Sequence, residues 1–280
     1  MATLNVNSCL ETWIAAAVSS EAMAWLHAAC QDAATGPLRQ WITTFALVPR
    51  RLGKEPLAVD LATAEAARPG WQPQGLRVDQ AARLRLLLAC QSGDVFDRCE
   101  QIAATADSNE LETLYRGLPL YPQPERYRAR AAEGCRSNIR ALFCAVAHRN
   151  PFPAEQFDDG AWNQMVLKAL FIETALAPIS GLDTRRNLAL ATMLTDYAAE
   201  RRAASRPVAV ELWRCVAPYA NERALAILHD LLRTGTEPER VAAALALHEA
   251  IGDVPGDPER EAAISGGTLN WDQLAPEEQT

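Results

Sequence analysis

Residues 114–153 read LYRGLPLYPQPERYRARAAEGCRSNIRALFCAVAHRNPFP, and residues 162–171 read WNQMVLKALF; these two segments decide the fold. Apolar residues recur in both at helical spacing, and prolines and glycines interrupt the runs. We expect one long helix from about Glu125 to His148, which stops before Pro151 because a residue that precedes proline avoids the helical conformation. We expect a second, buried helix from about Asp159 to Thr174, because apolar residues cover almost every direction around it.

Polar side chains stand singly in these apolar runs, where an ordinary surface helix would group them on one side. Polar groups against apolar surface cost free energy unless they are partnered, so the pattern indicates either an internal network or a binding surface. On the long helix we expect one apolar stripe that runs from Cys135 through Ile139 to Val146. Glu133 and Arg136 lie three residues apart and can form an ion pair. The opposite face is either solvated surface or one wall of a groove, and the residues leave both interpretations open.

Helix signals dominate the rest of the chain, and strand signals are nearly absent. Capping patterns predict that four helices begin near Ser8, Asp79, Asp107 and Thr236. The proline- and glycine-rich residues 50–77 are expected to form a short helix around Asp60 to Ala67 followed by loop. Shorter helices rich in alanine and leucine are expected over residues 208–217, 220–233 and 238–251. The fold class is therefore all-α, with antiparallel helix pairs in a layered or α-α superhelical (HEAT-like) arrangement.

The expected organisation has three parts. Residues 1–113 form an N-terminal helical region, residues 114–265 form a helical core whose last helices look like repeats, and residues 266–280 form a loose tail in which Trp271 docks locally. We expect these parts to form one continuous domain.

Composition excludes several classes of protein. The 280 residues carry a formal net charge of −8, which argues against a general nucleic-acid binder, because such proteins attract phosphates with lysine and arginine. No run approaches the roughly 20 apolar residues of a membrane helix, and the N-terminus lacks a signal-peptide pattern. The seven cysteines are scattered and never form CxxC, as in a reducing compartment. We expect a cytoplasmic protein with no metal, no cofactor and no direct membrane insertion.

Lys168 stands out in the second helix, because its surroundings in the sequence are apolar. Two interpretations are open. Its ammonium group reaches water at the end of a flexible side chain, or a carboxylate holds it inward, for which Glu133, Asp159 or Asp183 would serve. In the second case the pKa of the lysine would move, and the pair would become a candidate site.

Several long phrases together resemble the EboA family. They are LYRGLPLYP, EGCRSNIRALFCAVAHRNPFP, WNQMVLKALF, GLDTRRN and RPVAVELWRCVAPY. The resemblance is dense from about Leu114 to Ala220, whereas the first hundred residues are similar only in their helical character. It implies a cytoplasmic helical protein that acts in the traffic of a secondary-metabolite precursor and its export to the periplasm. It implies as partners other products of the same gene cluster, among them a membrane prenyltransferase-like protein, and a small-molecule metabolite.

The resemblance carries no catalytic residues over to this chain. The candidate binding residues are therefore the polar ones within the matching phrases. They are Arg116, Glu133, Arg136, Asn138, His148, Arg149, Asn150, Asn163, Lys168, Asp183 and Arg214.

Two functions remain to be weighed. Nucleophile-elbow, dinucleotide-binding and P-loop motifs are all missing, which favours a non-enzymatic helical adaptor or metabolite-binding protein. The alternative is an enzyme that uses Glu133, Arg136, His148 and Lys168 in acid/base or Schiff-base chemistry.

Overall fold

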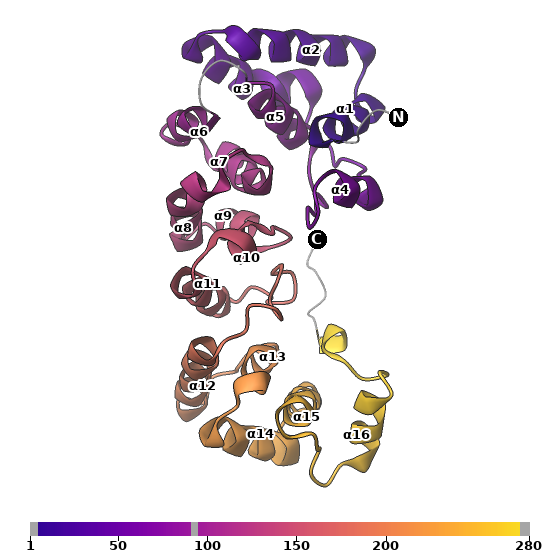
Figure 1. The fold of residues 1–280 in the computed structure, drawn as a ribbon, viewed down its shortest axis with the longest axis vertical. Coiled ribbons are helices and arrows are strands. Elements are labelled where there is room, and N and C mark those ends of the chain that lie inside the picture. The colour runs from indigo at the N-terminus through magenta and orange to yellow at the C-terminus, as the bar shows by residue number, and fades with distance from the viewer. Residues whose placement is uncertain (1–4, 91–94, 275–280) are drawn as a thin grey trace. The chain divides into compact units, whose positions relative to one another are not determined.

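The computed structural model describes residues 5–90 and 95–274. Within these ranges the chain forms α-helices and short 3-10 helices and no strand, which confirms the all-α class with packed helix pairs (Figure 1). None of the helices described combines the length and the apolar character needed to cross a membrane. The chain divides into two compact units, residues 1–157 and residues 158–280, called here the N-terminal and the C-terminal unit. The boundaries expected at residues 113 and 265 stay predictions.

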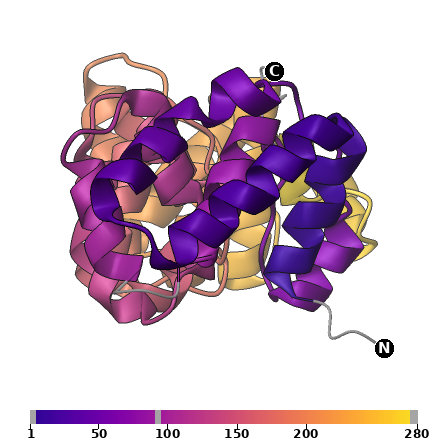
Figure 2. The same ribbon diagram turned by 90° about the horizontal axis from the view of Figure 1, so that it is seen from above.

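The N-terminal unit contains ten α-helices in its described part, drawn from indigo to rose in Figures 1 and 2. They are α1 (Val6–Ala17), α2 (Ser20–Thr35), α3 (Leu38–Leu52), α4 (Leu61–Ala67), α5 (Val78–Leu88), α6 (Val95–Ala103), α7 (Ser108–Arg116), α8 (Arg128–Arg136), α9 (Arg140–Ala147) and α10 (Phe152–Gln156).

Helix α5 is the core of this unit. It packs against α1, α2, α3 and α7, and its leucines Leu84, Leu86 and Leu87 are buried. Asp79 and Arg83 are buried with them as an ion pair at 3.3 Å, and Arg83 also donates to a backbone carbonyl oxygen of α3. Buried charges are tolerated when they are paired and hydrogen-bonded in this way. The prediction that Asp79 caps this helix was therefore wrong, because the N-cap is Arg77 and the Asp79 carboxylate binds arginines.

The long helix expected from Glu125 to His148 was also wrong, because the chain breaks between α8 and α9. Ser137 takes an extended conformation, and its hydroxyl oxygen accepts a hydrogen bond from the backbone N–H of Ile139 at 3.1 Å. Serine competes in this way with the helical backbone. The predicted apolar stripe is broken at the same place, since Cys135 and Val146 are buried whereas Ile139 is 47% exposed.

The break lets α8 and α9 pack directly against each other. Gly134 lies at the contact, where a Cβ atom would be 2.7 Å from Val146 and 2.9 Å from the ring of Tyr115. The absence of a side chain at residue 134 thus sets how closely the two helices approach.

The C-terminal unit contains six α-helices in its described part, coloured from rose to yellow in Figure 1. They are α11 (Asp159–Phe171), α12 (Leu188–Ala203), α13 (Leu212–Val216), α14 (Glu222–Thr234), α15 (Glu237–Ile251) and α16 (Pro258–Ser265).

Helix α15 is the centre of the C-terminal unit. Six consecutive residues from Ala242 to Leu247 are buried, and α15 packs against α13, α14 and α16. The short helix Trp271–Leu274 also packs on α15. The loose tail expected over residues 266–280 and the local docking of Trp271 stay predictions. Residues 275–280 lie outside the described residues.

Local capping explains where several helices begin. The boxes at Asp107 with Glu110 and at Thr236 with Glu239 are confirmed. The box predicted at Ser8 was wrong by one turn, because α1 begins earlier with Asn5 as the N-cap and Ser8 as its partner. Ser8 therefore lies within the first turn of the helix that it was predicted to cap.

Candidate functional site

The loop between α4 and α5 is held in place by arginine side chains. Arg68 pairs with Glu155 of α10 through two hydrogen bonds of 2.7 and 2.6 Å, and its Nε donates to the carbonyl oxygen of Pro119. Trp71 of the same loop is buried, with its ring 5.6 Å from that of Trp13. The proline- and glycine-rich segment expected as plain loop is thus an ordered wall of the N-terminal unit.

Asn150 fixes the backbone that faces this wall. Its amide Nδ2 donates to the carbonyl oxygens of Tyr115 and Ala145 at 3.0 and 2.9 Å, and its Oδ1 accepts from the N–H of Phe152 at 3.0 Å. The side chain therefore ties together the ends of α7, α9 and α10. Its hydrogen-bonding capacity serves the fold, which assigns Asn150 a positioning role rather than a ligand-binding one.

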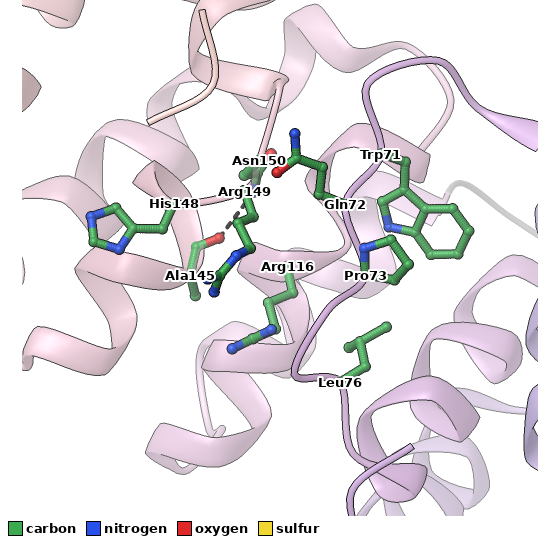
Figure 3. Close-up of a pocket in the computed structure, with 9 residues that line it drawn as sticks. All are labelled: Trp71, Gln72, Pro73, Leu76, Arg116, Ala145, His148, Arg149 and Asn150. Carbon is green, nitrogen blue, oxygen red and sulfur yellow. Dashed lines mark hydrogen bonds between the residues drawn. The ribbon is translucent and has the colours of Figure 1, made fainter. Parts of the chain in front are cut away.

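Arg149 directly precedes Asn150 and has a backbone φ of +51°. A non-glycine residue in the left-handed region carries about 1–2 kcal/mol of strain, and such strain concentrates at functional sites. The three hydrogen bonds of the Asn150 side chain offset this strain. Figure 3 shows the Arg149 side chain extending from this turn toward Ala145 and the Arg116 side chain.

A pocket lies between the loop, the end of α7 and the segment after α9 (Figure 3). Its lining residues are Trp71, Gln72, Pro73, Leu76, Arg116, Ala145, His148, Arg149 and Asn150. Four candidate residues from the sequence, Arg116, His148, Arg149 and Asn150, therefore meet here although residues 117–147 separate the first from the others. The enclosed volume of about 20 Å³ accommodates roughly one water-sized group.

Arg116 and Arg149 give the pocket its electrostatic character. Figure 3 shows both guanidinium groups directed to the same side of the pocket, whereas the His148 ring points away from them. Arg116 is anchored by Nε, which donates to Glu112 at 3.1 Å, and by Nη1, which donates to the carbonyl oxygen of Gln74 at 3.4 Å. No carboxylate is among the described lining residues. Two planar guanidinium groups without a carboxylate in the lining suit an anionic oxygen of a ligand.

The candidates on α8 lie elsewhere. Glu133 pairs with Arg130 at 2.8 Å, so the predicted pairing with Arg136 was wrong. Arg130 lies one turn earlier on the same helix, and it also pairs with Glu100 of α6. Arg136 and Asn138 are exposed at the break before α9. The residues of the proposed acid/base group are thus not brought together within the N-terminal unit: Glu133 pairs with Arg130, His148 lines the pocket, and Lys168 belongs to the C-terminal unit.

In the C-terminal unit, Asp183 and Arg214 form one two-point ion pair with distances of 2.8 and 2.6 Å. Burial alone would raise the pKa of Asp183, but the hydrogen bond and charge of Arg214 outweigh it, so this pKa lies below its ordinary value. Asn163 is buried and bonds to the side-chain amide of Asn187. Both arrangements fasten the segment before α12 to neighbouring helices, which is a structural role.

Lys168 is half-buried on α11 and forms no ion pair among the described residues. Two of the carboxylates expected to hold it inward are engaged with arginines: Asp159 binds Arg185 at 2.8 Å, and Asp183 binds Arg214. The interpretation in which a carboxylate of this unit holds Lys168 inward is therefore not supported. In the described ranges, no group of three histidine, cysteine or acidic residues is arranged to hold a metal ion.

The residues of the loop wall were missed by the sequence analysis. A signal was present at Trp71, because a large aromatic residue among prolines and glycines indicates a loop that packs rather than one that is only solvated. Gln72 and Pro73 carried no such signal. Their role follows only from the tertiary contacts of the loop.

The model of a protein family, described as metabolite traffic protein EboA, matches residues 6–217. The match begins in α1, so it also covers the helices before residue 114, and it contains every residue that lines the pocket. No curated protein and no solved structure matches the chain. The chain therefore belongs to the EboA family of metabolite traffic proteins.

Proposed function

We propose that this protein is a non-enzymatic metabolite-binding protein that serves the traffic of a secondary-metabolite precursor from the cytoplasm. The observation that carries the proposal is the meeting of Arg116 and Arg149 at one pocket in the N-terminal unit. The anionic group of the metabolite, a carboxylate or a phosphate, binds between the two guanidinium groups. The family description supplies the role in metabolite traffic.

The size of the pocket limits how the ligand binds. About 20 Å³ takes one anionic oxygen but not a whole metabolite, so the remainder of the molecule lies outside the pocket. Gln72 lines the same pocket and is placed to contact that remainder. A partner protein encoded in the same gene cluster would receive the metabolite from this exposed position.

The test isolates the tagged protein from its native host and identifies bound small molecules by native mass spectrometry. We expect an anionic metabolite on the wild-type protein and its loss from Arg116→Gln with Arg149→Gly. Glycine at residue 149 removes the guanidinium group while it relieves the backbone strain, so binding is separated from folding. Arg50→Gln, at an exposed position on α3, is the matched control and keeps the metabolite.

Two results would contradict the proposal. One is equal metabolite on the wild-type protein and the double variant. The other is turnover of the bound metabolite by the purified protein, which would favour an enzyme instead. A host strain that carries the double variant should also export less of the precursor than the Arg50→Gln strain does.

A further inference from the structure

A second hollow lies in the N-terminal unit between α1, α2 and α5, apart from the arginine pocket. It has a volume of about 410 Å³ and is open to solvent. This volume falls in the range of small-molecule sites. The residues that line it share one face of each helix: 7 and 11 on α1, 27, 30, 31 and 34 on α2, and 85 and 88 on α5, followed by its C-cap at 89. Positions three or four apart on a helix point the same way, so the three faces converge on the groove.

An ion pair between α1 and α5 lines this groove. Arg85 donates from both Nε and Nη2 to the same carboxylate oxygen, Oε1 of Glu11, at 2.9 and 2.7 Å. Within the described part of the chain, Oε2 of Glu11 and Nη1 of Arg85 make no hydrogen bond. The pair therefore presents an acceptor with negative charge beside a donor with positive charge.

Neutral polar groups line the groove together with the Glu11–Arg85 pair. The amide oxygen Oδ1 of Asn7 is buried without a hydrogen-bond partner in the described structure, and it stands one turn before Glu11 on α1. A buried acceptor without a donor is costly, and a ligand donor would remove that cost. On the other side, His27 and Gln31 are exposed at the rim on α2, where they can donate to an anionic group.

We propose that this groove binds a zwitterionic small molecule of the α-amino acid class. The ammonium group donates to Glu11 and Asn7, and the carboxylate accepts from Arg85 and Gln31. Cys30 contributes only a wall of the groove, since it is a buried thiol. The site is independent of the arginine pocket, so the protein has a second ligand besides the anionic metabolite.

The experiment titrates the full-length protein with each of the standard L-amino acids and measures binding by calorimetry. For the amino acid that binds most tightly, the N-acetyl and the carboxamide analogues are then compared with the parent. We expect each analogue to bind about 10- to 100-fold more weakly, because each loses one charge-assisted hydrogen bond. Absence of binding by every amino acid, or binding of either analogue as tight as that of the parent amino acid, would overturn the proposal.

Variants of the groove give a second readout. Asn7→Ala removes an oxygen that makes no hydrogen bond in the described structure, so the fold should be unchanged and the affinity for the parent amino acid should fall. Asn109→Ala, exposed on α7, is the matched control and should bind as the wild type does. Arg116→Gln with Arg149→Gly should also bind the amino acid normally, which distinguishes this site from the arginine pocket. Wild-type affinity in Asn7→Ala and in Glu11→Gln would refute the assignment.

Discussion

The side-chain amides of Asn163 and Asn187 bond to each other in both directions, with each Nδ2 donating to the opposite Oδ1 at 3.2 and 2.9 Å. Asn187 is also the N-cap of α12, where its Oδ1 accepts from the N–H of Leu190. One amide pair thus joins α11 to the beginning of α12. It explains why a polar residue lies in a nearly all-apolar helix.

Asn163→Ala should destabilise the protein by about 1–3 kcal/mol, because it removes both hydrogen bonds that the buried Asn163 makes with the half-buried amide of Asn187. Urea denaturation followed by tryptophan fluorescence measures this change. Gln164→Ala, at the exposed neighbouring position, is the control and should cost less than about 0.5 kcal/mol. Equal stability of the two variants would mean that the amide pair does not hold the helices together.

Asn150→Ala should increase hydrogen exchange at the ends of α7, α9 and α10. It removes three hydrogen bonds and leaves the buried carbonyl oxygens of Tyr115 and Ala145 unpaired, at a cost of about 2–4 kcal/mol. Asn138→Ala changes an exposed asparagine of the same unit and should leave exchange as in the wild type. If exchange rose only around residue 150, the hydrogen bonds of Asn150 would stabilise only its own turn and not the ends of the three helices.

Gly134→Ala should lower the melting temperature, although alanine is the better helix former by about 1 kcal/mol. The added methyl group would overlap Val146 and Tyr115, and overpacking of this kind costs about 1–3 kcal/mol. The net effect is a decrease in Tm of up to about 5 °C. Combining the change with Val146→Ala makes room on α9 and should recover part of that decrease, which a pure backbone effect would not do.

The Asp183–Arg214 pair should make a small contribution to stability that depends on pH. The pKa of Asp183 in the folded protein lies below its ordinary value of 3.8, so the contribution is present above that value and is lost as the pH falls through the lowered pKa. Because Asp183 is 44% exposed, solvent screening keeps it below about 1 kcal/mol. Urea denaturation of the wild type and of Asp183→Asn should differ at about pH 7 and agree at about pH 2. A difference of unchanged size at both values would contradict this account.

The buried cysteines should resist alkylation in the folded protein. Burial raises the pKa of Cys30 to about 11 and of Cys135 and Cys215 to about 12, so little thiolate is present at neutral pH. Cys90 and Cys144 are only partly buried and should react first. Mass spectrometry after brief iodoacetamide treatment measures the order, and denatured protein, in which all sites react alike, is the control. Early modification of Cys215 would show that the core of the C-terminal unit opens readily.

Local signals made much of the fold predictable. The capping boxes at Asp107 and Thr236 were identified correctly because their hydrogen bonds join residues only three positions apart. The break at Ser137 was missed because serine within a helix is only mildly unfavourable, and the choice depended on the packing of α8 against α9 around Gly134. Asp79 was misplaced for a similar reason, since its partner Arg83 made burial more favourable than capping.

The candidate site was predictable in part. Asn150 and Arg149 were candidates because they are polar residues within a phrase that resembles the EboA family. Their meeting with Arg116 depends on how α7 packs against α9, which spacing along the chain does not encode. The opposing loop depends on Arg68, whose partner Glu155 is distant in sequence. Asn163 and Asp183 were also polar residues within the matching phrases, but their side chains bond to residues of neighbouring segments and hold the fold together.

The family match ends at residue 217, whereas the C-terminal unit continues to residue 280. Helix α15 lies wholly beyond that boundary and packs on α13, where Trp213 is buried. A fragment that ends at residue 217 would therefore expose the indole ring of Trp213 to water, whereas the full chain buries it. The fold of the last helix within the matched region therefore depends on a helix beyond it, so residues 6–217 alone are not a complete folding unit of this chain.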